Sequence, residues 1–488
     1  MRRITTGLRI AAIVLLFQAS EALATDFATV DRITFRCFTE QKWDSVILVG
    51  KQALKEDIDY FYLRARMGIS YYNKEEYFPA ARHLEKARKF NAEDQAVNEY
   101  LYHSYLRCNR TVEASALRPP EPAAGGSGIS VTADGGYALS SDAEPGNLAT
   151  LAGNDSIYGE QDLYGNYYFS HAGVKVRVFS RVDLGFSYTY LSFDKTKYYQ
   201  YGHAEARLDS ISDNPFSLDY RYSFPWIMHD TAIPYRVKQQ EGHFSADFKA
   251  PGGVLVGTGL HLVHTRYPLI RQEVTDSVTD TAFFLKTDST WHLFSYPSAG
   301  YRYSLSDTSF TNWVVSLALS KQVGRVETGL TGSWSNLNGM TQWQAGASLA
   351  YYPLGNMDLY GKTAGTLFMQ SGEKRLLFSQ SAGGRILPWL WGEADLLYGD
   401  YTNANISGGS VVYNNSDLIR YRLGASLVAY AGKHLRITAA YRFFSKESRQ
   451  YFYIKTEDPV TMRVTETLQS KTNPYTTNTF IIGLTWNL

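Results

Sequence analysis

The stretch LIRYRLGASLVAYAGKHLRITAAYRFF, which runs from Leu418 to Phe444, is the clearest indication of the fold class of the chain. Every second residue in it is apolar or aromatic, and these residues are Ile419, Tyr421, Leu423, Ala425, Leu427, Ala429, Leu435, Ile437, Ala439, Tyr441 and Phe443. The residues between them are mostly small or charged: Arg420, Arg422, Gly424, Ser426, Val428, Arg436, Thr438, Ala440 and Arg442. Because successive side chains of a strand point to opposite faces, the stretch predicts two strands, each with one apolar face and one arginine-bearing face.

The same two-residue period recurs through the C-terminal part of the chain. It is clear over residues 182–190, 313–320, 326–334 and 342–351. The segments are long, often about twelve residues, whereas strands of soluble proteins average about five or six and tilted membrane strands need about nine to eleven. Their second row is rich in Gly, Ser, Thr and charged residues, as in the lumen of a membrane barrel. A transmembrane β-barrel therefore explains the pattern better than a soluble β-sandwich, which also alternates.

The connections between the expected strands indicate the same class. The short ones are residues 179–181, 250–252, 322–324, 353–356, 387–389 and 431–433, and the long polar ones are 141–157, 200–235, 270–280, 403–415 and 451–475. Short periplasmic turns and longer external loops are typical of outer-membrane barrels. Of the long loops, 200–235 is long enough to fold into the lumen.

The expected fold is an α + β multidomain chain: a small helical solenoid followed by an antiparallel transmembrane β-barrel over residues 128–488. Strand counting favours about sixteen strands, with about fourteen as the alternative. The count of sixteen needs a turn at Pro297-Ser298-Ala299-Gly300. A barrel of this size is wide enough to leave an aqueous lumen.

The first 24 residues have the composition of a secretory signal peptide. A basic start with Arg2, Arg3 and Arg9 precedes an apolar core from Ile10 to Phe17, and Ala22-Leu23-Ala24 forms a cleavage site. The alternative, a membrane anchor, is disfavoured because the core is shorter than the ~18 residues that a spanning helix needs. The mature chain is therefore expected outside the cytoplasm, and a net charge of +1 gives no indication of nucleic-acid binding.

Residues 25–117 carry apolar side chains at three- and four-residue spacing, which predicts helices. A 34-residue period relates small and aromatic residues of this region, and the expected packing residues are Gly68, Tyr71, Ala80, Leu84, Ala87, Tyr105 and Ala114. The pattern resembles about two and a half tetratricopeptide repeats, although the Trp of that motif is absent and Ala92 stands where the family usually has Pro. An unrelated helical hairpin bundle is the alternative. The resemblance implies a groove that binds a periplasmic protein or a passenger polymer and that has no chemistry of its own.

The two ends of the barrel region carry their own signals. Residues 118–127, rich in Pro and Gly, are expected to form a linker. At the C-terminus, one apolar row contains Phe480, Ile482, Leu484, Trp486 and Leu488. This row resembles the terminal-strand signal that the outer-membrane insertion machinery reads, although the family usually ends in an aromatic residue where this chain has Leu488. The resemblance implies that the insertion machinery and outer-membrane lipid are partners of the chain.

Charged residues of the inner row form a candidate ladder along the lumen: Arg420, Arg422, Arg436, Arg442, Glu393, Asp395, Lys175, Arg177 and Asp183. One hypothesis is that these charges guide an anionic passenger, since rings of charge tune selectivity in pores. The other hypothesis is that they pair with one another across neighbouring strands and stiffen the wall. Both signs are present, which favours the second.

No pattern in the sequence indicates catalysis, a metal site or a cofactor. His261 is expected to face the lumen and His264 the opposite side, so the two cannot bind one metal ion. Cys37 and Cys108 would lie about two repeats apart in a solenoid, too far for a disulfide, so we expect them to be buried and unpaired. The chain is therefore not expected to be an enzyme.

The combination of a repeat region with a barrel indicates the function class. By layout alone, the chain resembles exopolysaccharide-export porins and surface lipoprotein assembly modulators, both of which join tetratricopeptide repeats to an outer-membrane barrel. The resemblance implies a component for the export or assembly of a surface macromolecule, with the repeats in the periplasm. The alternative is a porin-like or structural barrel whose repeats anchor other envelope proteins.

Overall fold

The computed structural model describes residues 26–108, 110, 113–114, 117, 128–142, 157–179, 181–204, 207–214, 217–223, 226–250, 253–287, 290–414, 416–432, 434–457 and 464–488. The expected signal peptide, residues 1–24, and the expected linker, residues 118–127, lie outside the described residues. The chain divides into two compact units, one of residues 1–121 with 352–358 and the other of residues 122–351 with 359–488.

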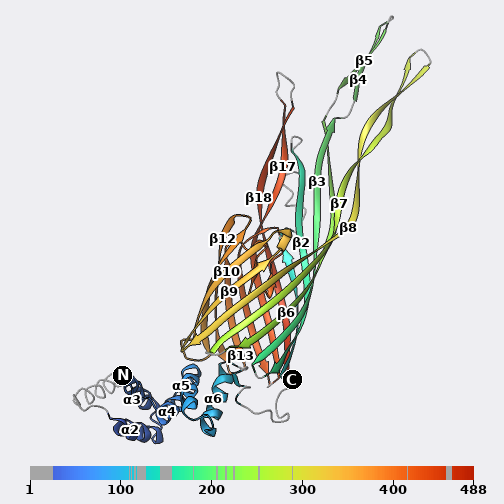
Figure 1. The fold of residues 1–488 in the computed structure, drawn as a ribbon. Helices are drawn as coiled ribbons and strands as arrows, with labels where there is room; N and C mark the ends of the chain where they lie inside the picture. Colours follow the sequence, from blue (N-terminus) through green and yellow to red (C-terminus); the bar gives the residue numbers. More distant parts are fainter. Residues whose placement is uncertain are drawn as a thin grey trace, which may run out of the picture. The chain divides into compact units, whose positions relative to one another are not determined.

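The first unit is helical, as the sequence predicts (Figure 1). Its described helices are α2 (Phe27–Thr39), α3 (Trp43–Lys55), α4 (Phe61–Asn73), α5 (Tyr77–Phe90) and α6 (Gln95–Arg107). The starts of α2, α4 and α6 are 34 residues apart, and so are those of α3 and α5. The 34-residue sequence period is therefore a period of paired helices. None of the described helices is long and apolar enough to cross a membrane.

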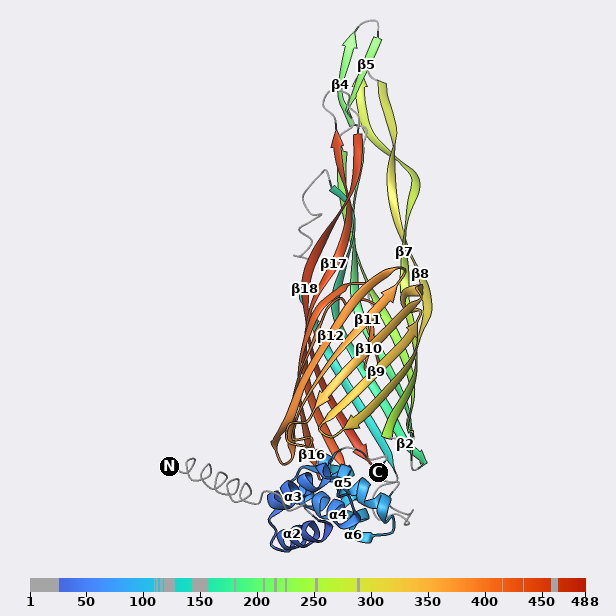
Figure 2. The ribbon, with the colours of Figure 1, turned by 60° about the vertical axis from the view of Figure 1, so that its left-hand side comes forward.

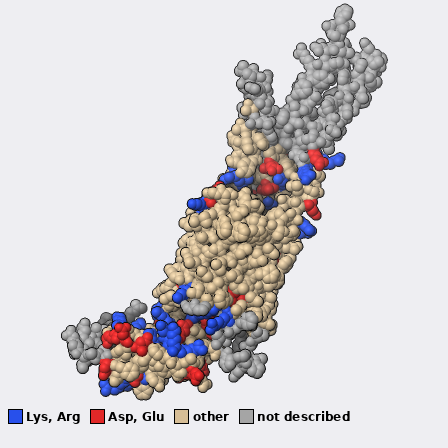
Figure 3. Space-filling model, in the orientation of Figure 1, with Lys and Arg blue, Asp and Glu red and all other residues tan. Residues whose placement is uncertain are grey.

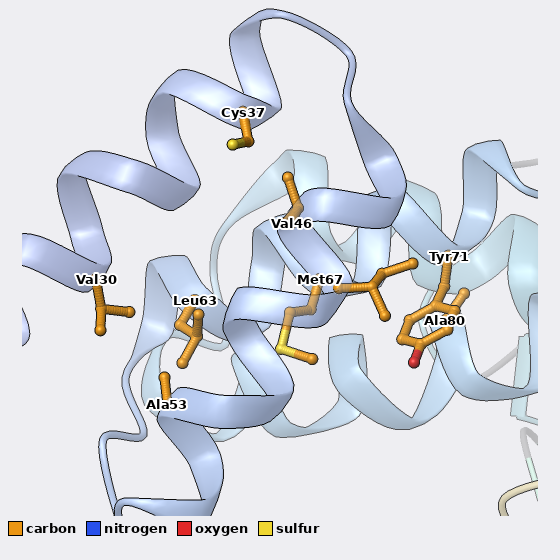
Figure 4. Close-up of a cluster of buried hydrophobic side chains, with 9 residues drawn as sticks. Val30, Cys37, Val46, Ala53, Leu63, Met67, Tyr71 and Ala80 are labelled. Carbon is orange, nitrogen blue, oxygen red and sulfur yellow. The ribbon is translucent and has the colours of Figure 1, made fainter. Parts of the chain in front are cut away.

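Two clusters of buried side chains hold the helices together. Figure 4 shows the first cluster, in which Val30 of α2, Val46 of α3 and Met67 of α4 are buried between the helices. The second joins Leu84 of α5 to Leu101 of α6. All seven expected packing residues are buried, namely Gly68, Tyr71, Ala80, Leu84, Ala87, Tyr105 and Ala114.

Both cysteines are buried and unpaired, as expected. Cys37 lies in the first cluster of buried side chains, and Cys108 follows α6. Burial raises the pKa of the Cys108 thiol, so little of it exists as the reactive thiolate.

The second unit is a closed antiparallel β-barrel of fourteen strands, closed by pairing of its first and last strands, β1 and β18 (Figures 1 and 2). The strands are β1 (Ile129–Ser140), β2 (Ile157–Phe179), β3 (Val182–Ala204), β6 (Trp226–Lys249), β7 (Val254–Thr287), β8 (Thr290–Val323), β9 (Val326–Ser335), β10 (Gln342–Tyr351), β11 (Leu359–Gln370), β12 (Glu373–Leu387), β13 (Leu390–Tyr398), β16 (Leu418–Ala431), β17 (Leu435–Glu457) and β18 (Val464–Asn487). Two short sheets, β4 (Arg207–Asn214) with β5 (Ser217–Ser223) and β14 (Asn405–Ile406) with β15 (Val411–Val412), lie in connections.

The favoured count of sixteen strands is wrong, and the alternative of fourteen is correct. No turn forms at residues 297–300, which lie within β8, where Pro297 pairs with Thr279 of β7. Pro has no N–H to donate, so it is tolerated in a strand only where the edge that its N–H would face has no partner strand. Here β9 pairs with β8 only from Val314 to Val323, so β8 has an unpaired edge at Pro297 that tolerates the missing donor.

Three of the long connections are extensions of strands instead of irregular loops. Residues 270–280 lie inside β7, which pairs with β8 as one hairpin as far as Thr287 and Thr290. Likewise, β3 pairs with β6 as far as Ala204 and Trp226, and β17 with β18 as far as Glu457 and Val464. These hairpins continue beyond the barrel wall at one end (Figures 1 and 2). Beyond Ser140, where β1 ends, β2 pairs with β17 in place of β1. This pairing connects the extended part of β17 to that of β3, the other neighbour of β2.

The outer face of the barrel is apolar. Most of the large apolar residues of the expected outer row are exposed, for example Leu349 (51%) and Leu423 (48%). On the face that Figure 3 shows, the middle of the wall carries neither basic nor acidic side chains. Cross-strand aromatic contacts lie on the outer face of the barrel, such as Trp334 with Trp313 (4.6 Å between ring centroids) and with Trp343 (5.5 Å). A closed sheet satisfies its own backbone and can present such a surface to lipid.

A cysteine scan tests which face meets lipid. In a chain with Cys37 and Cys108 replaced by Ala, an environment-sensitive fluorophore at Leu423→Cys or Leu349→Cys should emit as in hydrocarbon and be quenched by a lipid-soluble quencher. The matched control, Ser426→Cys, is on the inner row of the strand that holds Leu423, so its label should be quenched from water. Water-like emission at both leucine positions would contradict the membrane orientation.

Close helix packing in the first unit can be tested at Gly68. A β-carbon built on Gly68 lies 2.5 Å from Leu84 Cγ and 3.2 Å from the Leu84 backbone nitrogen, so a larger residue forces α4 and α5 apart. We expect Gly68→Val to lower the free energy of unfolding of the helical unit by about 1–3 kcal/mol, the usual range for overpacking. Far-UV circular dichroism during denaturant unfolding measures it. Arg82→Val, at an exposed position of α5, controls for the helix propensity of Val.

Candidate functional site

The connection between β13 and β16, whose described residues are 399–414, 416 and 417, lies inside the barrel, and we call it the lumen loop. Its described residues contact inward-facing side chains from seven strands: His261 of β7, Ser316 of β8, Ser333 of β9, Gln344 of β10, Arg375 of β12, Arg422 of β16 and Tyr475 of β18. Because these strands lie on different sides of the barrel, the loop extends across the lumen. The expectation that 403–415 is an external loop is therefore wrong.

One side of the lumen loop is seated on an apolar patch of the inner wall. The wall residues of this seat come from five consecutive strands, β11, β12, β13, β16 and β17, and are Phe368, Leu377, Leu397, Ile419 and Phe444. From the loop, Tyr401 (2% exposed) and Ala404 (0%) pack on them, with Ile406 and Tyr413 at the edge. An inner barrel wall is ordinarily polar. Burial of each large side chain contributes roughly 1.5–3 kcal/mol, so the seat is a sizeable local core.

A β-bulge explains why Ile419 belongs to this seat. The pairing of β16 with β17 shifts by one residue between Ile419 and Tyr421. The extra residue reverses the alternation, so Ile419 faces inward, although the sequence places it on the outer row. Arg420, the residue at the bulge, has a 60% exposed side chain and forms an ion pair with Glu447 at 2.5 Å. The structure thus places Arg420 outside the charge ladder.

The opposite side of the loop is held by hydrogen bonds. His261 Nδ1 is 2.9 Å from the carbonyl oxygen of Gly409, and the Ser316 hydroxyl donates to the carbonyl oxygen of Gly408. Asn405 donates to the Ser333 hydroxyl at 3.1 Å. Positive φ angles at Gly408 (66°) and Gly409 (81°) form the tight tip that reaches the wall, a backbone conformation that Gly adopts without strain.

Two inward arginines bind the loop beside the seat. Arg375 forms an ion pair with Asp400 (2.6 Å), donates to the carbonyl oxygen of Thr402 (3.1 Å), and lies over the ring of Phe368. Arg422, only 8% exposed, donates to the Tyr413 hydroxyl (2.8 Å) and forms an ion pair with Asp395. Both guanidinium groups therefore connect the barrel wall to the loop.

The other ladder residues mostly pair with each other along the wall. Arg177 Nε donates to Asp183 Oδ1 (2.8 Å), and Lys175 Nζ is 2.9 Å from Asp247 and 3.8 Å from Asp183. Glu393 accepts a hydrogen bond from the Tyr360 hydroxyl. Arg177, Lys175 and Asp183 thus have ionic partners on the wall, whereas Glu393 has a hydroxyl partner.

Two ladder arginines have a different environment. Arg436 donates to the Thr485 hydroxyl at 3.0 Å. Within the described ranges, neither Arg436 nor Arg442 has a carboxylate within ion-pair distance. Their guanidinium groups thus differ from those of Arg177 and Arg422, which pair with Asp183 and Asp395.

The histidines of the barrel are candidate ligands for a metal ion. In the part of the chain that the structure describes, no three His, Cys, Asp or Glu side chains converge as a metal site would require. His261 faces inward at 2% exposure, and His264 lies on the other row near Thr311, as the alternation predicts.

Together, closure, an apolar outer surface and a polar inner row define a transmembrane β-barrel of the outer-membrane type. No protein-family model matches the sequence, and a search of curated proteins returns no match.

Several solved structures share a general likeness to the chain. A Pseudomonas aeruginosa FadL homologue is 11% identical with a TM-score of 0.40, covering 77% of this chain and 92% of its own. The Pseudomonas putida toluene transporter TodX is 11% identical with a TM-score of 0.40, covering 79% and 94%. A bacterial polysaccharide outer membrane secretin is 9% identical with a TM-score of 0.31, covering 74% and 99%.

The apolar seat predicts how tightly the loop is held. Phe368→Ala leaves a cavity under Tyr401 and should loosen the loop, because truncating a buried Phe typically costs about 3–5 kcal/mol. We expect the thiol at Ser410→Cys, an exposed loop position, to react at least about tenfold faster with a water-soluble maleimide in that background. Leu367→Ala, the neighbouring residue on the outer row, is the control and should leave the rate unchanged. Equal rates in both variants would argue against the seat.

Proposed function

We propose that the protein is an outer-membrane channel for small polar solutes, and that the lumen loop sets its width. The observation that carries this proposal is the attachment of one loop to inward side chains of seven strands. A loop held across the lumen narrows the path to the polar space around it. Arg436 and Arg442 on β17 supply positive charge to that path, which favours anionic over cationic solutes.

The same observation weighs against free passage of a large passenger. Polar wall residues at the level of the loop, such as Gln342 (0% exposed) and Asn312 (2%), are covered. A polymer or a folded chain would therefore need the loop to leave both its seat and its hydrogen bonds. Small solutes need no such rearrangement, and this difference is why the channel is the preferred function.

A second candidate, export or assembly of a surface macromolecule, is supported by the helical unit. Its helix pairs recur every 34 residues, as in tetratricopeptide repeats. Exposed aromatic side chains on the first helices of two successive pairs, Phe35 (56%) on α2 and Tyr62 (59%) on α4, offer a binding surface. On this proposal the unit is a repeat domain in the periplasm that binds a partner protein or a passenger polymer.

Single-channel recording with a covalently fixed loop tests the channel. A β-carbon built on Gly409 lies 3.1 Å from Ser316 Cβ, near the range of about 3.5–4.5 Å for a disulfide, so Ser316→Cys with Gly409→Cys should cross-link in a chain with Cys37 and Cys108 replaced by Ala. We expect a small conductance from the oxidised form and a severalfold larger one after residues 402–414 are replaced by a short Gly-Ser link. No conductance from the loop-deleted barrel, shown to be folded by its electrophoretic mobility without heating, would exclude a channel.

Deletion of residues 25–117 separates the two candidates. A channel should keep its conductance without the helical unit. An export component should instead leave its passenger in the periplasm of the deletion strain.

A further inference from the structure

The tip of the lumen loop meets a histidine whose two ring nitrogens both face oxygen acceptors. His261, on the inner face of β7, is 2% exposed. Its Nδ1 is 2.9 Å from the carbonyl oxygen of Gly409, and its Nε2 is 3.0 Å from Oε2 of Glu241 on β6.

Proton counting shows what this arrangement requires. A backbone carbonyl only accepts hydrogen bonds, so Nδ1 must carry a proton to bind Gly409. A neutral imidazole then has no second proton for the Glu241 carboxylate. Both contacts exist together only when the His261–Glu241 pair holds one extra proton, on the ring or on the carboxyl group. Without that proton, one contact sets two lone pairs against each other.

The polar side chains around His261 and Glu241 restrain the pair, and none of those described below takes the place of either residue. Gln239 donates to the second oxygen of Glu241 at 2.6 Å and so restrains the carboxylate. On β6, the centroid of the His243 ring lies 5.3 Å from that of the His261 ring. The carboxylate of Asp247, on the same strand, interacts electrostatically with His243. On β2, His171 bonds to Asp134 of β1 at 2.8 Å.

Among the described residues, the neighbour of His261 on β8 is Val314, and the loop brings Gly409 and Gly408 to this point. None of these three residues carries a charge. Among the described residues, Glu241 is the carboxylate within hydrogen-bond distance of His261.

We propose that the His261–Glu241 pair is a proton-dependent latch that holds the lumen loop across the channel. This inference rests on the proposed channel function and adds its regulation. With the extra proton, the loop tip is bound to β7 and the path is narrow. As the pH rises and the extra proton leaves, the one proton of the neutral ring goes to Nε2, because the Glu241 carboxylate is a stronger acceptor than a backbone carbonyl. The bond to Gly409 is then lost, the Ser316 hydroxyl alone of these two contacts still holds the tip, and the path widens.

Two substitutions should set the latch in opposite states. His261→Phe removes the donor, so the channel should be open at every pH. Glu241→Gln should keep it closed at every pH, because the Gln amide can donate to Nε2 while Nδ1–H still donates to Gly409, and no extra proton is needed. The native chain should change its ratio of open to closed time by about tenfold between about pH 5 and about pH 8, the effect expected of one hydrogen bond to a charged group.

Controls address the other histidines. His264→Gln, on the same strand but the opposite row, and His243→Gln, beside the latch, should both keep the native pH response. Loss of the response in His243→Gln would reassign the titrating group and overturn the proposal, as would a native pH response in both latch variants.

A second readout separates the latch from the channel. A nitroxide on Ser410→Cys, with Cys37 and Cys108 replaced by Ala, should become more mobile as the pH rises in the native background and stay immobile in Glu241→Gln. A pH-dependent nitroxide in a barrel that never conducts would refute the channel and keep the latch. A conducting barrel whose nitroxide ignores pH would refute the latch and keep the channel.

Discussion

Every backbone N–H and C=O of a strand that crosses a bilayer must be bonded within the protein, and the structure of the second unit follows from this constraint. Closure between β1 and β18, over eleven paired residues from Ser130–Asn487 to Ser140–Thr477, removes the last free edges from the wall. Only a closed sheet can afford an outer face of Leu, Ile, Val and aromatic side chains. The long hairpin extensions obey a looser rule, because strands beyond the bilayer can leave an edge to water.

Inside the cylinder the constraint is different, because the inner wall must be hydrated or covered. Most of it is lined by Ser, Thr, Gln and paired charges, which suit water. The apolar seat is the exception, and its five wall residues would be poorly hydrated without the lumen loop. Tyr401 and Ala404 cover them, and the loop gains in return an anchor on one wall. Hydrogen bonds to β7, β8, β9 and β10 fix the other side, so that one connection is held at two walls by two kinds of interaction.

The charges of the lumen divide along similar lines. Arg177, Lys175, Asp183 and Asp247 neutralise one another near the start of the barrel, and such pairs fix the wall without leaving a strong field. Arg375 and Arg422 instead connect the wall to the loop. On the proposed channel function, the width and the charge of the path depend on the same loop, and a proton at His261 would act on both.

Local sequence patterns were enough to predict the features that depend on neighbours a few residues away. Alternation predicted a closed antiparallel barrel with Leu349 and Leu423 outside and Arg422 and His261 inside, because the side-chain period of a strand is local. Helical spacing predicted the N-terminal unit for the same reason. The prediction from sequence failed at residues 297–300, where a turn-like composition lies within a strand. A Pro-containing segment can pair as a strand when one of its edges is free.

The contents of the lumen depend on contacts between distant parts of the chain, which local patterns do not show. One bulge at Ile419 reversed the facing of two residues, and no local signal marks it. The lumen loop reads as an ordinary polar connection, and the inward Phe368, Leu377 and Leu397 read as isolated departures from a polar row. These wall residues form one seat because the loop packs on them, and the loop is positioned by contacts such as that of His261 with Gly409, 148 residues apart in the chain. Contacts at that separation follow from how the barrel closes and not from the pattern of any single strand.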